Sequence, residues 1–146
     1  MATAGYMTGM QGVYLVAAEL TALGFIVSPT LRNAAGADLL VTDPTCQKAW
    51  TVQVKTNKKA ASFWLLSANA AQMKSESHVY VFVNIGNGLG PEYPEYVVVP
   101  SAHVAEKMKI KPARPGTIWY EFWKADRLYK EGPGWREVFG PIMQPG

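Results

Sequence analysis

The chain has 146 residues, of which 49% are hydrophobic and 17% are charged, and its formal net charge is +3. This composition excludes a disordered chain, and no apolar stretch is long enough to span a membrane. The start of the sequence has neither the basic residues nor the apolar run of a secretory signal. We therefore expect one domain over residues 1–146, located in the cytoplasm. A single cysteine, Cys46, excludes an internal disulfide and a cysteine-rich zinc site.

The first part of the chain predicts a helix followed by three short strands. Apolar residues recur at helical spacing over residues 12–23, and Gly24 stands where a helix ends in a left-handed conformation. Strands are predicted next at residues 25–27, 39–42 and 50–56. A turn at residues 43–45 makes a hairpin of the second and third strands.

The second part predicts helices and strands in alternation. An alanine-rich segment at residues 67–75 predicts a helix, and the unbroken apolar run at residues 79–83 is typical of a strand in the middle of a sheet. A strand at residues 96–99 is followed by a helix from Ser101, a favourable N-cap, through Lys107. The aromatic tail is interpreted as a strand or turn and a terminal helix on the core. The order α-β-β-β-α-β-β-α predicts an α/β sandwich with a mixed sheet flanked by helices.

Basic residues are clustered in two segments. No acidic residue lies between Asp43 and Glu76, a segment that contains Lys48, Lys55, Lys58, Lys59 and Lys74. A second basic group extends from Lys107 to Arg114. Such clusters are either solvated faces or surfaces that attract nucleic-acid phosphates without regard to sequence, and both interpretations stay open here.

One acidic and two polar residues are placed on the two strands of the predicted hairpin. Asp38 opens the first of these strands, and Gln53 and Lys55 lie on the second. Because side chains alternate between the faces of a strand, Gln53 and Lys55 point to one side, with Val52 and Val54 on the other. The hairpin can therefore bring Asp38 beside the polar pair.

These groups suit a divalent cation at a phosphate. Carboxylate and amide oxygens are ligands that Mg²⁺ or Mn²⁺ accepts, and Lys55 can hold an attacking water and offset charge on the phosphate. Glu19, at the edge of the apolar stripe of the first helix, could add a fourth group. Taken singly, Asp38 could cap a turn, and Gln53 with Lys55 could be a solvated strand face; their joint order favours a site.

The arrangement resembles the PD-(D/E)XK nuclease superfamily, most closely its Mrr-like and Holliday-junction-resolvase-like branches. The resemblance rests on a helix that carries a glutamate, on Gly-x-Asp at residues 36–38 and on Gln-x-Lys at residues 53–55, and it extends over residues 12–83. Ala37 replaces the proline of the family pattern. A glutamine at the position of the second acid removes one negative charge, which puts metal affinity and activity in doubt.

The resemblance implies a restriction-endonuclease-like α-β-β-β-α-β core and a role for each site residue. Asp38 would be the principal metal ligand, Gln53 and the carbonyl of Val54 would complete the metal shell, and Lys55 would act in catalysis. Glu19 matches the helical glutamate of several members. The implied cofactor is Mg²⁺ or Mn²⁺.

The sequence therefore predicts a metal-dependent endonuclease that hydrolyses DNA phosphodiester bonds through a metal-activated water. Lys48, Lys58 and Lys59 are expected to follow the DNA backbone, which positions DNA without specifying its sequence. Trp64 is either a core residue or a platform on which a base or sugar stacks. A homodimer is the usual way to cut both strands. The alternative is an inactive module of the same fold that binds nucleic acid or a protein partner, which Gln53 allows.

Overall fold

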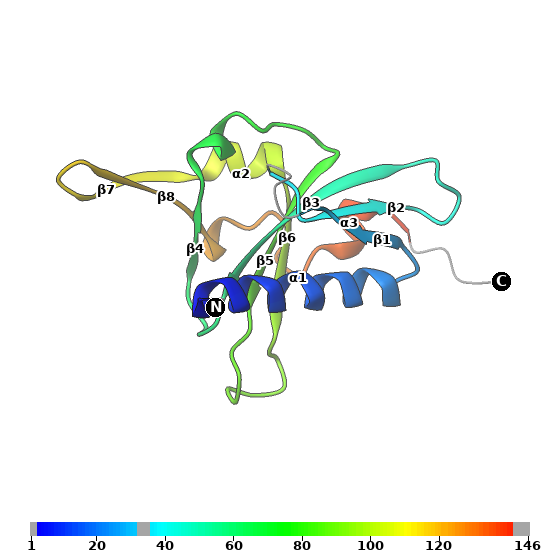
Figure 1. Cartoon of the computed structure of the whole chain (residues 1–146). Helices are drawn as coiled ribbons and strands as arrows, with labels where there is room; N and C mark the ends of the chain where they lie inside the picture. The colour runs from blue at the N-terminus through cyan, green and yellow to red at the C-terminus, as the bar shows by residue number, and fades with distance from the viewer. Residues whose placement is uncertain (1–2, 32–35, 142–146) are drawn as a thin grey trace.

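A computed structural model describes residues 3–31 and 36–141, and its centre is a five-stranded sheet of order β1-β2-β3-β5-β6 (Figure 1). The strands are β1 (Ile26–Pro29), β2 (Leu39–Thr42), β3 (Ala49–Asn57), β5 (His78–Asn84) and β6 (Glu95–Pro100). β3 and β5 run parallel and the other neighbouring pairs antiparallel. The mixed sheet that the sequence predicts is therefore confirmed.

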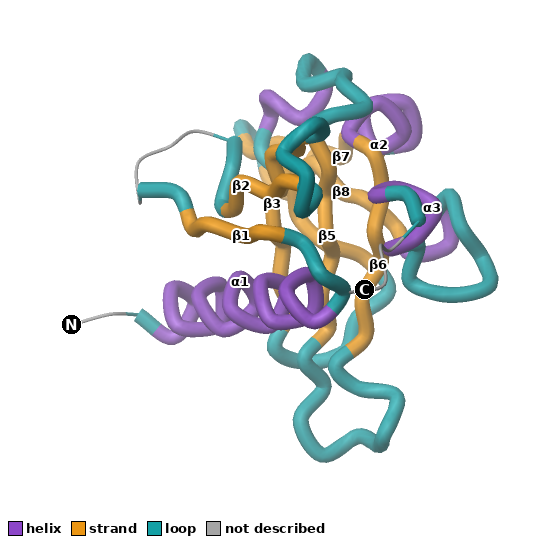
Figure 2. Tube along the Cα trace, turned by 90° about the vertical axis from the view of Figure 1, so that its right-hand side faces the viewer, coloured by secondary structure: helices purple, strands orange, loops and turns teal. Residues whose placement is uncertain are grey.

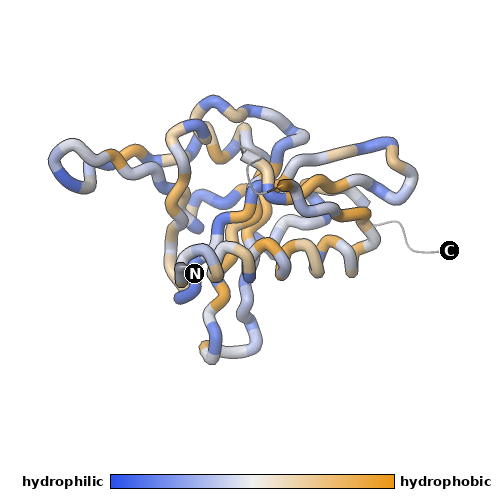
Figure 3. The backbone as a smooth tube through the Cα atoms, viewed as in Figure 1, coloured by the Kyte–Doolittle hydropathy of each residue, from blue (hydrophilic) through white to orange (hydrophobic). Residues whose placement is uncertain are grey.

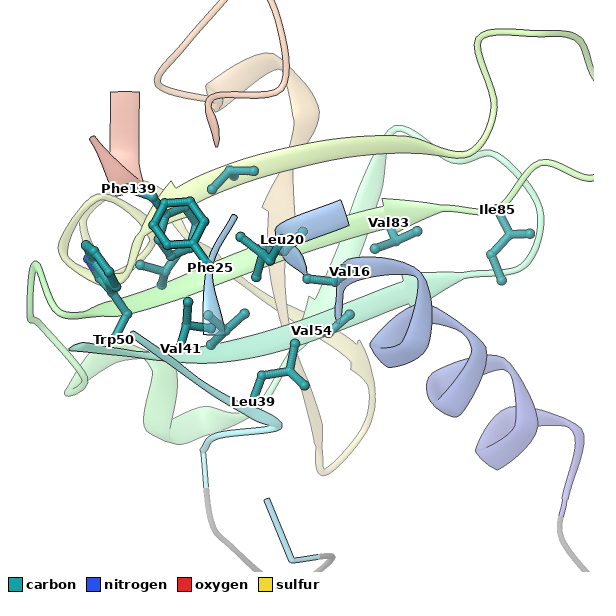
Figure 4. Close-up of a cluster of buried hydrophobic side chains, with 14 residues drawn as sticks. Val16, Leu20, Phe25, Leu39, Val41, Trp50, Val54, Val83, Ile85 and Phe139 are labelled. Atoms are coloured by element: carbon teal, nitrogen blue, oxygen red, sulfur yellow. The ribbon is translucent and has the colours of Figure 1, made fainter. Parts of the chain in front are cut away.

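The long helix α1 (Ala4–Ala22) covers one face of this sheet (Figure 2). Its buried residues Val16 and Leu20 join the apolar side chains of β2, β3 and β5 in one core, which also takes in Phe139 near the end of the chain (Figure 4). The helix approaches β3 so closely that a Cβ at Gly12 would lie 1.8 Å from Thr56 Oγ1. Only glycine allows this close approach of α1 to the end of β3.

The opposite face of the sheet is covered by a second, three-stranded sheet of order β4-β8-β7 and by the helix α2 (Ser101–Lys107). The strands of this sheet are β4 (Phe63–Leu66), β7 (Lys109–Arg114) and β8 (Thr117–Trp123). Phe82 of β5 stacks on Phe122 of β8 with ring centroids 4.7 Å apart. This aromatic core fixes the smaller sheet on the larger one.

The helix predicted at residues 67–75 is wrong. Those residues hold only the 3-10 turn η1 (Ala68–Ala71), because the preceding residues are extended in β4 and pair with β8. A helix that short also has little stability of its own, and Ser67 makes no capping hydrogen bond. The crossover from β3 to β5 is therefore a strand and a turn.

The remaining elements differ from the prediction in two ways: β7 is a strand that was not predicted, and the N-cap of α2 is Pro100. Ser101 does not cap α2; its hydroxyl instead donates to the carbonyl of Ser75 and accepts from the Ser75 N–H. The short helices η2 (Lys124–Asp126) and α3 (Trp135–Phe139) end the described chain, and Phe139 packs on Phe25 and Trp50 as expected for a terminal helix. Among the described helices, none combines the length and the hydropathy that crossing a bilayer requires.

Candidate functional site

Asp38 lies where β2 and β3 separate. Pairing of the two strands reaches Leu39 opposite Val52, and the Asp38 N–H still donates to the Val52 carbonyl at 2.7 Å. Beyond this point β2 no longer pairs with β3, and the Asp38 side chain provides the hydrogen-bond acceptor that a paired strand would otherwise provide. Its Oδ2 accepts from the Val54 N–H at 2.8 Å and from Gln53 Nε2 at 3.1 Å.

This geometry also orients the Val54 carbonyl. The N–H and C=O of a strand residue point to the same side of the strand, and the Val54 N–H points at Asp38. The Val54 carbonyl therefore faces the side on which β2 has ended. The Asp38 carboxylate thus contacts the Gln53 amide at this separation of the strands, and the Val54 carbonyl, which the resemblance implied as a ligand, lies on the same side of β3.

Lys55 lies on the same face of β3 as Gln53, where the neighbouring strand β5 places Tyr80 beside Gln53 and Phe82 beside Lys55. Burial among these residues lowers the pKa of Lys55, and the negative charge of Asp38 partly offsets this effect. Burial raises the pKa of Asp38, against the opposing effects of the Val54 N–H and the Lys55 ammonium. Both charges are thus held in a partly dehydrated place, which strengthens their action on a nearby ligand.

A cavity of about 340 Å³ opens beside Asp38, Gln53 and Val54. The first half of α1 lines it from the other side with Gly5 and Gly9; apart from their chain neighbours and the backbone of their own helix, no described atom lies within 4 Å of a Cβ built on either glycine. The volume falls within the range of small-molecule sites. The sequence analysis missed this wall because it started the helix at residue 12, although Thr3, which caps the helix, was a signal for the earlier start.

The structure is similar to that of Hjc, a Holliday junction resolvase from the archaeal hyperthermophile Archaeoglobus fulgidus. The TM-score is 0.56 at 13% sequence identity, over 93% of this chain and 98% of that chain. A bacterial homing endonuclease matches at a TM-score of 0.45 and 15% identity, over 69% of this chain and 67% of that one. No family model and no curated protein matches the sequence.

The chain has the restriction-endonuclease-like fold. The likeness to Hjc covers nearly all of both chains and confirms the fold class that the sequence predicts. Within the restriction-endonuclease-like fold, Asp38 directly precedes β2 and the Gln53–Lys55 pair lies on β3, the order that the PD-(D/E)XK resemblance implied. At 13% identity, the likeness concerns the fold alone.

The predicted contribution of Glu19 to this site stays a prediction; the residues of α1 that line the cavity beside Asp38 lie between Gly5 and Tyr14 and do not include Glu19. Glu19 is exposed on α1, and after burial its negative charge is the second cause that raises the pKa of Tyr96 to about 12. Tyr96 belongs to β6, three strands from β2, and three steps between neighbouring strands measure roughly 14 Å. Helical spacing predicts that Glu19 lies at the edge of the apolar face of α1. It does not predict which strand of the sheet that part of the helix packs against.

Trp64 is a core residue and not a stacking platform for nucleic acid. Its side chain is 1% exposed, its Nε1 donates to the Val83 carbonyl at 2.9 Å, and its ring contacts Phe82. The core interpretation of this residue, which the sequence left open, is confirmed. A base has no access to a ring in this position.

The three lysines expected to follow DNA are exposed, but they lie at opposite ends of β3. Lys48 precedes β3 in the turn after β2, five residues from Gln53, or about 17 Å along an extended strand. Lys58 and Lys59 follow the other end of the strand, and Lys58 lines a shallow hollow together with residues of α1. DNA contacts by these lysines stay a prediction.

The donor set fits Mg²⁺ in a limited way. Among the described residues, no three side chains of the types His, Cys, Asp and Glu come close enough to hold an ion. Mg²⁺ is often held by one or two carboxylates together with substrate phosphates and water, and it requires oxygen ligands. One carboxylate, one amide and one carbonyl meet this requirement once a phosphate supplies further oxygens.

Proposed function

We propose that this protein is a metal-dependent endonuclease that hydrolyses phosphodiester bonds of DNA. The observation that carries the proposal is the meeting of Asp38, Gln53 and Val54 at the separation of β2 and β3, beside a partly buried lysine. The fold, which this chain has in common with a Holliday junction resolvase, supports the same function.

Asp38, Gln53 and the Val54 carbonyl would hold Mg²⁺ or Mn²⁺, which supplies a Lewis acid at the phosphate and a more acidic water when it is bound. Lys55 donates hydrogen bonds from its ammonium to the attacking water or to a phosphate oxygen, and its charge opposes the negative charge that grows on the phosphate. The Val54 N–H keeps the Asp38 carboxylate in place at 2.8 Å. Partial burial keeps competing water away from both charges.

The second candidate is an inactive module of the same fold that binds nucleic acid or a protein partner. The orientation of Gln53 favours it: the amide donates its N–H to Asp38 Oδ2 at 3.1 Å, so its oxygen points away from the carboxylate. A shared cation would require the amide to turn and present its oxygen. The Gln53–Asp38 hydrogen bond thus competes with metal binding, which two carboxylates would not do.

Nicking of supercoiled plasmid with Mg²⁺ and with Mn²⁺ separates the two candidates. We expect cleavage by the natural chain and a loss of about 10³-fold or more, equivalent to about 4 kcal/mol, in Asp38→Asn and in Lys55→Ala. Glu19→Gln is the matched control, because it makes the same change from acid to amide away from the site. Cleavage that persists in both site variants would contradict the proposed role of Asp38 and Lys55 in catalysis.

A homodimer remains the expected means of cutting both strands of a duplex, since one site cuts one strand. Linear plasmid formed in step with the first nick, together with a dimer mass by light scattering, is the expected result. Salt-dependent DNA binding without cleavage in either metal would support the inactive module instead.

A further inference from the structure

The β7–β8 hairpin projects from the rest of the molecule and has no role in the site described above (Figure 1). Its base is anchored where Phe122 and Glu121 of β8 are buried. Towards the turn the side chains emerge into solvent: Ile110 is 60% exposed, Ile118 56% and Trp119 41%. A two-stranded ribbon that is free on both faces beyond its base needs an explanation, because apolar side chains on it gain nothing from the core.

The hairpin is also basic. The sequence contains no acidic residue between Glu106 and Glu121, and this segment holds Lys107, Lys109, Lys111 and Arg114. Figure 3 shows the hydrophilic turn beyond the more hydrophobic strands. Arg114 is exposed next to the turn, where no described element of the body covers it. The projection therefore presents positive charge away from the body of the protein.

The lysines of the hairpin share one face. The ammonium groups of Lys109 and Lys111 lie 5.3 and 4.9 Å from the centroid of the Trp123 ring, which stacks on Phe63. Lys111 Nζ also lies 3.2 Å from a carboxylate oxygen of Glu121. These contacts hold both ammonium groups on the face that carries Trp119, since Lys111 and Trp119 are paired across the strands.

The structure favours a polyanion over a second copy of the chain as the occupant of this hairpin. β7 is the edge of its sheet, and pairing with another strand there is hindered by Pro112, which has no N–H, by the irregular register between Pro112 and Arg114, and by the lysines. The positive charges of Lys109 and Arg114, neither of which forms an ion pair with a described residue, attract phosphates instead. A two-stranded β-ribbon fits the major groove of duplex DNA, which is about 12 Å wide.

We propose that the β7–β8 hairpin is a second DNA-contacting element, which grips the duplex at a distance from Asp38. Arg114 and Lys109 contact phosphates, and Trp119 packs against the sugar and base edges between them. This inference rests on the proposed function, because it assigns the same substrate to a different surface. It predicts that the hairpin governs affinity and leaves the chemical step unchanged.

The test uses the full chain with Asp38→Asn in the background, so that a labelled duplex of about 30 base pairs is bound without being cut. We expect Arg114→Ala to weaken binding about 3- to 10-fold at moderate salt, and the slope of log K against log salt to fall by about 0.9, the value for one phosphate contact. Arg136→Ala is the matched control, an exposed arginine on α3 at the other side of the molecule, and should change affinity less than twofold. Equal affinities and slopes for both variants would overturn the proposal.

Cleavage by the chain without Asp38→Asn distinguishes this proposal from the proposed function. Arg114→Ala should raise the DNA concentration needed for half-maximal nicking and leave the saturated rate as it was. If no variant nicks DNA but Arg114→Ala still weakens binding, the DNA-binding role of the hairpin is supported and the proposed nuclease function is rejected. If Arg114→Ala binds normally and Ile118→Ser turns a dimer into a monomer in sedimentation, the hairpin is a protein interface and the inference is wrong.

Discussion

The two faces of β3 differ although their residues alternate along one strand. On the face towards α1, Trp50, Val52 and Val54 are buried in an apolar core. On the other face, Gln53 and Lys55 are only partly buried, and the pKa of Lys55 is lowered by burial. The face towards α1 stabilises the fold, while the opposite face holds the Lys55 ammonium where burial disfavours its charged form. One strand therefore carries both stability and chemistry, divided by the period of two.

A substitution can disrupt the packing on the apolar face of β3 and leave the polar face unchanged. Leu20 of α1 has no exposed surface, so Leu20→Ala removes buried carbon atoms and leaves a cavity, at an expected loss of about 2–5 kcal/mol in the free energy of unfolding. Denaturant unfolding measures this loss. Leu40→Ala is the matched control, since Leu40 is 49% exposed on β2 and should lose far less. Equal losses in the two variants would contradict the assignment of Leu20 to the core.

The polar face can be sharpened by Gln53→Glu, which places a second carboxylate beside Asp38. Without metal, the two negative charges repel and Asp38 loses an N–H donor, so the free energy of unfolding should fall by about 1 kcal/mol. With Mg²⁺, the added charge should tighten binding about tenfold, or about 1.4 kcal/mol. Calorimetric titration and thermal unfolding with and without Mg²⁺ check both signs. Unchanged Mg²⁺ affinity would mean that position 53 does not face the ion.

The smallest effect is expected for the stability of Asp38→Asn. Both hydrogen bonds to Asp38 end on one oxygen, Oδ2, so an asparagine carbonyl in its place can accept both. Because burial raises the pKa of Asp38, the folded state binds the proton more tightly than the unfolded state, and stability is lost as pH rises through the raised pKa. Asp38→Asn does not undergo this loss. At pH 7 its Tm should exceed that of the natural chain by a few degrees, which corresponds to less than about 1 kcal/mol in the free energy of unfolding.

Thermal unfolding at acidic and at neutral pH measures this difference. The advantage of Asp38→Asn should be small below the ordinary pKa of an aspartate, where both side chains are neutral, and should grow towards neutral pH. An advantage that shrinks as the pH rises would show that the Val54 N–H and Lys55 outweigh burial at Asp38.

Much of the candidate site could be predicted because it is local. The turn between β2 and β3 makes a hairpin, and alternation along β3 places Gln53 and Lys55 on one face, so the approach of Asp38 to Gln53 needs no distant partner. The pairing of strands 39–42 and 49–57 confirms this part of the prediction. The glutamate of the helix could not be placed in the same way, since the direction in which α1 crosses the sheet is a long-range property.

By itself, the sequence determined the strands of the sheet, the face on which each side chain lies and the order of the groups at the site. Periodicity and turn residues act within a few positions, so they can be recognised along the chain. Only the tertiary structure decided which face is covered and by what: residues 63–66, for which no element was predicted, form β4 and pair with β8, and Trp64 is buried. Such pairings join residues more than fifty positions apart, and their free energy comes from burial of surfaces that no local pattern identifies.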